Sequence, residues 1–352
     1  MKARLPILDF LRWTLATYVI FFHFWAWTKN ESYWENKHAI VVILQYGYLS
    51  VDIFFVLSGF AIFASTDGKN TLDFIEARIK RLVPTFIFVS IIETIFTFFL
   101  YEKHLWGNGI ISIINVSAQN LLPISGNDSL LRNFVAWSIS VEIQFYTILA
   151  ICLLFFQITR NKITDSTMLL IRLFMFLIYF LGFLDAKSWL RSPIIEYMPY
   201  FLFGATMWCF TQMKSKFFNI KFLDFVVIIP LLSRTISSRL GNAPDPSKTK
   251  YGAFISLFFI AMFLLGIFLK SSNLSKFSKF IGTSSYALYL LGGFTGIQIF
   301  IHFKNGMGIT NSALLSYSIC SIIALAYQKV LDLPLQRVIL KKALRISDNV
   351  DS

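Results

Sequence analysis

Long apolar runs separated by short polar connections dominate the chain. The first run, Leu5–Trp27, is long enough to cross a bilayer, which takes about 20 apolar residues. The pattern predicts an all-α fold, a polytopic membrane helix bundle with about ten transmembrane helices. The expected spans are Leu5–Trp27, Gly47–Ser65, Val83–Tyr101, Phe134–Gln157, Thr167–Leu184, Ile195–Gln212, Phe222–Arg239, Tyr251–Leu269, Phe280–Phe303 and Ile309–Val330.

Lys and Arg residues are distributed unevenly between the two sides of these spans. With the N-terminus in the cytoplasm, 18 of them fall in cytoplasmic segments and 11 in exterior segments. Cytoplasmic loops carry an excess of Lys and Arg, so both termini are predicted to be cytoplasmic. After a membrane domain of residues 1–333, residues 334–352 carry Arg337, Lys341 and Arg345 at four-residue spacing. That spacing predicts a basic amphipathic tail on the anionic inner leaflet.

Composition agrees with a membrane protein and excludes several other classes. The chain is 56% hydrophobic and 14% charged, which is not the composition of a soluble domain. Its net charge of +13 comes from short loops, so we predict no nucleic-acid partner. The 3 cysteines are isolated and the 4 histidines lack metal-ligand spacing, so no metal site is expected.

Two basic residues interrupt the first span, Arg12 and His23. Their separation of 11 residues corresponds to about three turns plus 20°, so both side chains leave one helix face about 16 Å apart. Charged groups inside membrane helices are costly and usually face the protein interior. The pair therefore indicates that one face of this helix carries functional residues along the bundle. The alternative is that the Arg12 side chain extends to the membrane interface and that His23 is a hydrogen-bonded histidine of the core.

Carboxylates also fall inside later spans, and two of them are candidates for the site. Asp52 lies in the second span and Glu142 in the fourth. If these spans run from outside to inside, both lie about 8–12 Å below the outer edge, and His23 lies about 6 Å below it. We therefore expect the three side chains to share one depth and form a catalytic cluster. The alternative is a structural ion cluster that holds the helices together.

A basic segment, Arg78, Lys80 and Arg81, ends the predicted loop between the second and third spans. One interpretation is a topology anchor, since basic residues concentrate on the cytoplasmic side. The functional interpretation is a phosphate clamp at the cytoplasmic mouth, because Arg and Lys are the usual phosphate ligands.

Five stretches in order resemble the acyltransferase 3 family of integral membrane acyltransferases. Arg12 and His23 match its Arg-x10-His signature, and residues 47–60 resemble its GVDLFFVLSGF stretch. Residues 78–84 resemble RLxRxxP, residues 137–146 resemble WSLSVEEQFY, and residues 282–291 resemble GxxSYSLYLLH. Three positions depart from these patterns: Trp13 replaces a Gly, Ile143 replaces the second Glu, and Gly292 stands where a His often follows.

This resemblance implies transfer of an acyl group, most often acetyl, from cytoplasmic acyl-CoA to a hydroxyl of an exported cell-surface polysaccharide or glycolipid. The implied partners are acyl-CoA (acetyl-CoA), a glycan or glycolipid acceptor and membrane lipids, in a multi-pass protein of the bacterial cell membrane. The donor is anionic, and Arg12, Arg78, Lys80 and Arg81 are expected on its side. The 16 Å rise from Arg12 to His23 is comparable with the reach of a pantetheine arm.

His23 is the candidate general base, because a sugar hydroxyl is a poor nucleophile at neutral pH. Glu142 first, and Asp52 second, would orient the imidazole and stabilise its charged form. A covalent acyl-enzyme is a further route that the sequence does not exclude. The competing function is a transporter or flippase that uses the same residues to bind substrate or relay protons. No internal repeat of the kind such transporters carry is present in the two halves.

Overall fold

The computed structural model describes residues 5–66, 71–101, 135–160, 165–184, 193–212, 249–268 and 275–332. Within these ranges all regular secondary structure is helical. The α-helices are α1 (Pro6–Thr28), α2 (His38–Leu44), α3 (Leu49–Thr66), α4 (Thr71–Tyr101), α6 (Ala136–Arg160), α7 (Asp165–Leu184), α8 (Pro193–Gln212), α10 (Thr249–Phe268), α11 (Ser275–Leu291), α12 (Ile297–Met307) and α13 (Ile309–Tyr327). A 3-10 turn, η1 (Ser32–Trp34), and two π-helical turns, η4 (Gly292–Gly296) and η5 (Gln328–Asp332), complete the set.

The predicted all-α membrane class is confirmed in its coarse form. By length and composition, 6 of the described helical segments could cross a membrane: Pro6–Thr28, His38–Thr66, Trp137–Phe156, Lys250–Ile267, Phe277–Met307 and Ile309–Val330. Three further predicted spans fall on α4, α7 and α8, which are helical but are not among these 6. The predicted span 222–239 and the tail 334–352 lie outside the described residues. The count of about ten spans and the placement of both termini stay predictions.

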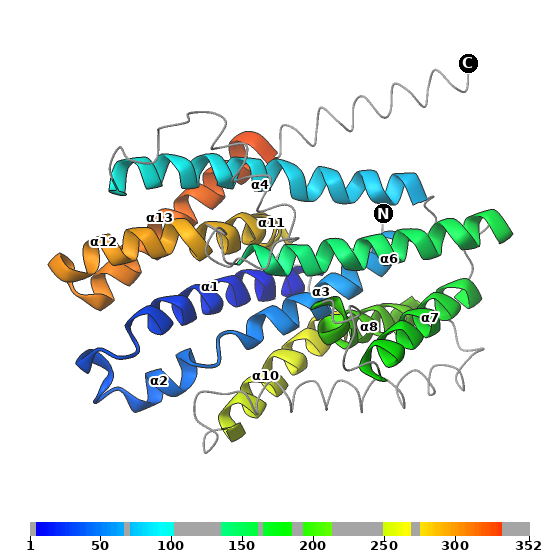
Figure 1. Ribbon diagram of the computed structural model, residues 1–352, viewed down its shortest axis with the longest axis horizontal. Helices are drawn as coiled ribbons and strands as arrows, with labels where there is room; N and C mark the ends of the chain where they lie inside the picture. The colour runs from blue at the N-terminus through cyan, green and yellow to red at the C-terminus, as the bar shows by residue number, and fades with distance from the viewer. Residues whose placement is uncertain are drawn as a thin grey trace.

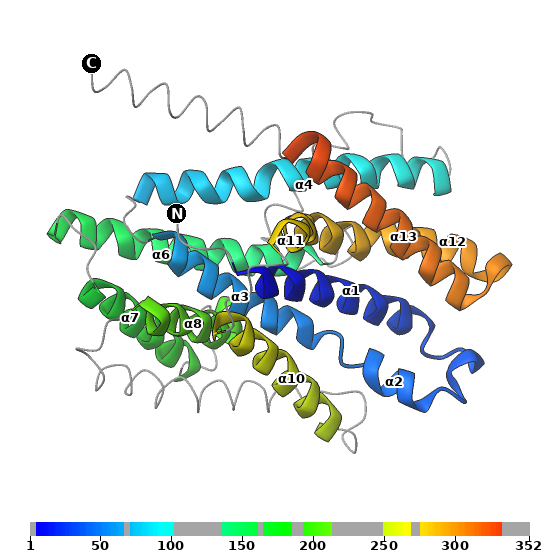
Figure 2. The same ribbon diagram turned by 180° about the vertical axis from the view of Figure 1, so that it is seen from behind.

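Helix α1 lies at the centre of the bundle. It contacts α3, α10, α11 and α13, and both views show it between α11 on one side and α3 on the other (Figures 1 and 2). Side chains along its length are buried, from Leu8 to Phe24. One face of α1 is therefore placed inside the protein along most of its length.

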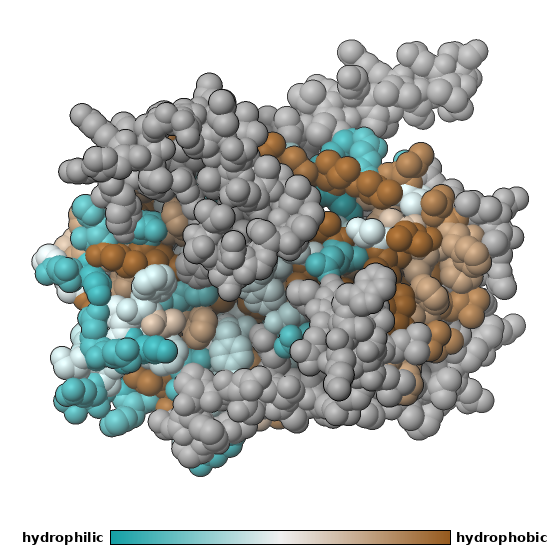
Figure 3. All heavy atoms as spheres, in the orientation of Figure 1, coloured by the Kyte–Doolittle hydropathy of each residue, from teal (hydrophilic) through white to brown (hydrophobic). Residues whose placement is uncertain are grey.

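The outer surface of the bundle is apolar, as expected of a surface that faces lipid. Large apolar side chains on α6 and α10 are half or more exposed, among them Leu154 at 50%, Ile151 at 61% and Phe254 at 69%. Figure 3 shows brown, apolar side chains gathered on one half of the visible face, with polar residues at the end where α1 joins α2. A soluble protein rarely exposes so large an apolar surface.

Glycines allow two helix pairs to approach closely. A Cβ on Gly59 of α3 would lie 2.1 Å from the carbonyl oxygen of Phe201 in α8, and one on Gly204 of α8 would lie 1.9 Å from the oxygen of Val56. On the other side of α1, a Cβ on Gly282 of α11 would lie 2.4 Å from the Cβ of Asp9. Small residues at such crossings let membrane helices pack backbone to backbone.

The basic segment at residues 78–81 is helical, which corrects the predicted loop. Helix α4 runs without a break from Thr71 to Tyr101, and Pro84 lies inside it. Its buried side chains recur every three or four residues, at Phe74, Arg78, Leu82, Phe86, Val89 and Glu93. The apolar stripe thus extends beyond the charged residues toward the start of the helix. The charges obscured this periodicity in the sequence.

Candidate functional site

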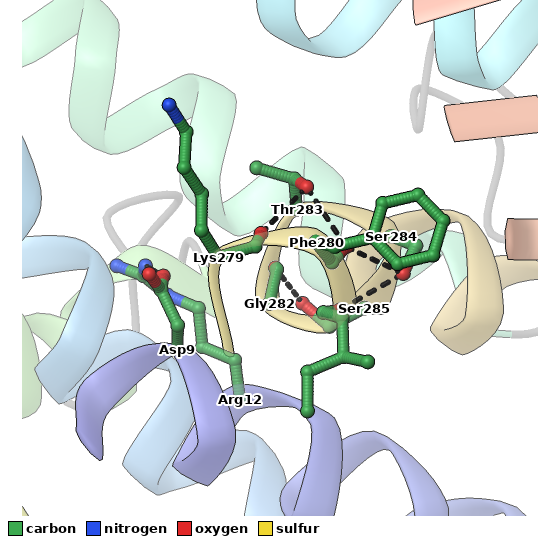
Figure 4. A network of polar contacts seen from close by, with 9 residues as sticks. Asp9, Arg12, Lys279, Phe280, Gly282, Thr283, Ser284 and Ser285 are labelled. Carbon is green, nitrogen blue, oxygen red and sulfur yellow. Dashed lines mark hydrogen bonds and ion pairs between the residues drawn. The ribbon is translucent and has the colours of Figure 1, made fainter. Parts of the chain in front are cut away.

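Arg12 is held on α1 by its own helix. Its Nη1 donates a hydrogen bond to Oδ1 of Asp9 at 3.2 Å, and Asp9 is 1% exposed. Figure 4 shows the two side chains together on α1, next to the turn of α11 that carries Gly282. Because Gly282 has no side chain, α11 packs directly against Asp9. The carboxylate therefore orients a guanidinium that the sequence alone singled out.

Arg12 borders a small polar cavity of about 60 Å³ between α1, α3, α4, α6 and α11. The polar side chains that line it are Arg12, Ser58, Arg81, Ser138, Glu142, Ser285, Tyr286 and Tyr289. The cavity brings together three residues that the sequence predicted for the site, Arg12, Arg81 and Glu142. Arg81 is also exposed, so it lies at the mouth of the cavity.

Glu142 accepts hydrogen bonds from two hydroxyl groups. Ser58 Oγ donates to its Oε1 at 3.1 Å, and the Tyr146 hydroxyl donates to the same oxygen. Arg81 interacts electrostatically with Glu142 and with Asp9. The carboxylate thus faces a guanidinium and is fixed by α3 and by its own helix, as expected for a charge inside a membrane bundle.

Tyr289 joins α11, which lines the cavity, to the start of α6 through hydrogen bonds of its hydroxyl group. Its hydroxyl is 2.9 Å from Ser138 Oγ and 3.3 Å from the carbonyl oxygen of Val135, to which it donates. Tyr289 is 7% exposed. This contact sets the position of the α6 turn that carries Glu142.

The other two basic residues of the predicted clamp point elsewhere. Lys80 pairs with Glu76 on the outer face of α4, where their side chains are 37% and 59% exposed. Arg78 is 8% exposed and donates to Ser65 Oγ. Its guanidinium also lies over the rings of Phe74 and Tyr146. Only Arg81 of this segment therefore lines the cavity: Lys80 leaves the helix about 100° away from it, and Arg78 lies almost one turn earlier along the axis.

Contacts of η4, the turn that follows α11, fix the depth of Glu142 relative to α1. A Cβ on Gly292 would lie 2.2 Å from Ile20 of α1, and one on the next residue, Gly293, would lie 2.3 Å from Val135. Residue 135, just before α6, is therefore level with Ile20. From there α6 runs toward the Arg12 end, and Glu142 lies seven residues on, roughly 10 Å deeper.

The expected common depth of His23, Asp52 and Glu142 is not observed. His23 lies three residues from Ile20 in the opposite direction along α1, so it is separated from Glu142 by roughly 15 Å along the axis. Asp52 is 3% exposed but lines no part of the Glu142 cavity, and neither does His23, which is half-buried. The structure thus groups Glu142 with the arginines.

Four residues that line the cavity or bond to its lining were not assigned a role from the sequence. Asp9, Tyr146, Tyr286 and Tyr289 all contribute to the site. Three of them lie inside stretches that carried the family resemblance, and Tyr146 follows Glu142 by one helical turn. That i, i+4 spacing was the available signal for the Tyr146 hydrogen bond. No group of three or more His, Cys, Asp or Glu side chains that could hold a metal ion occurs in the described ranges.

Comparison with known proteins identifies the family of the chain. A family model described as an acyltransferase domain, Acyl_transf_3, matches residues 5–327. The chain belongs to the acyltransferase 3 family. The five stretches of this chain that resemble the family's motifs all fall inside the matched range.

Among individual relatives, the peptidoglycan O-acetyltransferase OatA of Listeria monocytogenes is 25% identical over 333 residues, covering 81% of this chain and 48% of the relative. The O-acetyltransferase OatA of Staphylococcus aureus is 30% identical over 128 residues, or 32% of this chain and 21% of the relative. The acyltransferase MdmB of Streptomyces mycarofaciens is 28% identical over 155 residues, or 41% and 38% of the two chains. No solved structure matches.

The chain spans about half the length of the Listeria relative and less of the other two. The family model is an acyltransferase domain, and two of these relatives are O-acetyltransferases. They do not favour the transporter or flippase alternative.

The departure at position 292 has a physical reason in this fold. Gly292 begins the π-helical turn η4 and packs against Ile20, whose Cγ1 would lie 2.2 Å from a Cβ at this position. A histidine here would need α1 and α11 to move apart. The π-turn is fully buried.

Proposed function

We propose that the protein transfers an acetyl group from acetyl-CoA to a hydroxyl of an exported cell-surface glycan or glycolipid. Family membership supports acyl transfer, and the OatA relatives support an O-acetyl product. The observation that carries the proposal is the buried cavity in which Arg12 and Arg81 meet Glu142. Two oriented guanidinium groups inside a membrane protein are suited to an anionic substrate such as the CoA diphosphate.

We assign the donor contacts to Arg12 and Arg81. Arg presents a planar fork that matches phosphate oxygens with two parallel hydrogen bonds. Arg81 at the cavity mouth would meet the donor first, and Arg12, held by Asp9, would meet it further inside. Glu142 is assigned to positioning Arg81, in place of the role beside His23 that the sequence favoured.

His23 is the proposed general base. It would take the proton from the acceptor hydroxyl as the oxygen attacks the thioester carbonyl carbon, and the C–S bond then breaks to release CoA. The thiolate of CoA leaves with the proton that His23 returns. With the diphosphate near Arg12, a pantetheine arm about 16 Å long would bring the thioester to His23 along α1. Asp52 is not assigned a contact in this scheme.

The direct test compares cells with and without the gene. Surface glycans are isolated and treated with mild alkali, and the released acetate is measured. We expect the acetate to depend on the gene, and His23→Ala to abolish it at wild-type protein level. His38→Ala is the matched control, because His38 is exposed at the start of α2 and should be neutral.

Purified protein provides the donor half of the test. Free thiol released from acetyl-CoA in the presence of the extracted glycan reports turnover of the donor. Release that depends on both the glycan and the protein supports the proposal. Glycan acetylation that is unchanged by deletion of the gene, or that persists in His23→Ala, would overturn it.

A further inference from the structure

A long apolar groove runs between α4 and α6, beside the Glu142 cavity. It has a volume of about 450 Å³, within the usual range of about 300–1,000 Å³ for ligand pockets. Its walls extend from Thr71 to Phe86 on α4 and from Ile139 to Leu154 on α6, which is roughly 22 Å on each helix. The groove therefore has the direction of an alkyl chain that lies along the bundle axis.

The groove opens on the flank of the bundle. On its rim, Ile79 is 54% exposed, Ile151 is 61% exposed and Leu154 is 50% exposed. All three belong to the apolar outer surface described above, and Figure 3 shows brown side chains over this part of α4 and α6. A molecule already dissolved in the bilayer could enter sideways, without leaving the membrane.

One cation is buried in this apolar wall. Arg78 lines the groove and is 8% exposed. Its Nη2 donates a hydrogen bond to Ser65, and its guanidinium carbon lies 5.4 Å and 5.6 Å from the ring centres of Phe74 and Tyr146. These contacts fix the guanidinium at the middle of the groove, seven residues from Thr71 and eight from Phe86.

Two buried donors on residues that line the groove have no hydrogen-bond partner among the described residues. They are Nε of Arg78 and the hydroxyl of Tyr286, and both residues line the groove. Buried polar groups are nearly always satisfied, so each unsatisfied donor calls for an acceptor. A phosphate supplies several acceptor oxygens and a negative charge to pair with the buried guanidinium of Arg78.

We propose that the groove binds one anionic glycerophospholipid of the surrounding bilayer. Its phosphate lies against Arg78 and Tyr286, and one of its alkyl chains lies between α4 and α6. Basic pockets between membrane helices are known to bind anionic lipid head groups. The choice of an anionic lipid follows from charge complementarity, and the choice of a bilayer lipid follows from the open flank.

The bound lipid would also form part of the active-site wall. Ile139 and Tyr286 line both the groove and the Glu142 cavity. A lipid in the groove therefore packs against the far side of the same two residues. Its binding does not depend on the acetyl transfer proposed above.

The test measures lipid retention by native mass spectrometry. The full chain is purified from nanodiscs that contain equal amounts of phosphatidylglycerol and phosphatidylcholine, which differ in head-group charge. We expect the wild-type protein to retain one phosphatidylglycerol with at least a ten-fold preference. Arg78→Gln should abolish the preference, whereas Lys80→Gln, a matched loss of charge on the outer face of the same helix, should keep it.

A second measurement does not depend on the stability of a variant. A photoactivatable phosphatidylglycerol with its reactive group in the alkyl chain is crosslinked to the wild-type protein and the labelled peptides are mapped. Labels are expected within 71–86 or 139–154, and Ala150→Phe, which fills the groove, should reduce them. Equal retention of both lipids, equal loss in Arg78→Gln and Lys80→Gln, or labels confined to other helices would overturn the proposal.

Discussion

At the scale of single residues, Arg81 and Lys80 are neighbours in sequence that face different surroundings. Arg81 lines the cavity that also holds Arg12, whereas Lys80 pairs with Glu76 on the outer face of α4. The count of Lys and Arg residues that predicts membrane orientation does not distinguish these two residues. Substitutions that preserve charge can therefore separate a phosphate ligand from a topology anchor.

Arg81→Lys should raise the KM for acetyl-CoA while protein insertion stays normal. Lysine keeps the charge but cannot form the planar fork, and the loss of one charge-assisted hydrogen bond costs roughly 1.5–3 kcal/mol, or about 10- to 150-fold in affinity. Thiol release at varied acetyl-CoA measures the effect. Lys80→Arg is the matched control and should leave KM unchanged. A wild-type KM in Arg81→Lys would remove this residue from the donor site.

Glu142→Gln tests whether the carboxylate acts through Arg81. Because Glu142 faces Arg81 and is held by Ser58 and Tyr146, its neutral amide should loosen the guanidinium and raise the KM for acetyl-CoA. The double mutant with Arg81→Lys should be non-additive, with a coupling of about 0.5–3 kcal/mol. Strictly additive effects on KM would show that the two residues act separately. Glu196→Gln, at an exposed position on α8, is the control.

At the scale of elements, the contact between α3 and α8 depends on the absence of a side chain at Gly59. An added Cβ would lie 2.1 Å from the backbone oxygen of Phe201, and a backbone cannot rotate away as a flexible side chain can. Ser58, which bonds Glu142, is the preceding residue. The spacing of α3 and α8 therefore also determines one contact of the site.

Gly59→Ala should destabilise the protein, because overpacking a tight contact typically costs about 1–3 kcal/mol. Gly306→Ala is a stringent control: no atom lies within 4 Å of its added Cβ, and replacing a helical glycine by alanine gains about 0.5–1 kcal/mol. Thermal unfolding of the two purified variants should move in opposite directions. A Gly59→Ala protein that melts at or above the wild-type temperature would contradict the close contact.

Helix bounds are the part of the fold that the sequence predicted well. The expected first and fourth spans, Leu5–Trp27 and Phe134–Gln157, correspond to α1 (Pro6–Thr28) and α6 (Ala136–Arg160). Hydrophobic length is a local property, so it can be read along one chain segment. The start of α4 was missed, because charges near Arg78 concealed an apolar stripe that faces the protein.

At the scale of the whole molecule, orientation in the membrane determines which side each substrate reaches. Helix α4 is 31 residues long, or roughly 46 Å, so its two ends lie at opposite ends of the bundle (Figure 1). The excess of Lys and Arg predicts that its first end is cytoplasmic. The cavity mouth at Arg81 would then face the side that holds acyl-CoA.

Reporter fusions test this orientation. A fusion after Lys69 should report the cytoplasm and one after Glu102 the exterior, because α4 crosses between these positions. An enzymatic reporter active only in the cytoplasm, paired with one active only outside, measures both. The reverse pattern would place Arg12 and Arg81 on the outer side and would exclude them as ligands of cytoplasmic acyl-CoA.

The sequence by itself determined the class of the protein, the bounds of most helices, the shared face of Arg12 and His23, and the family. Each of these depends on residue types and spacing within one segment. Which residues meet in space was decided by tertiary structure: Glu142 lies beside Arg12 and Arg81, about 15 Å from His23 along the axis.

The physical reason is the axial offset between helices. Periodicity fixes the face and the rise of a residue on its own helix, but it does not say where a neighbouring helix begins. Here the offset is fixed by contacts between distant segments, Gly282 with Asp9, Gly292 with Ile20, and Tyr289 with Ser138. These contacts start α6 deep inside the bundle, and thereby place Glu142 at the arginine end of the site.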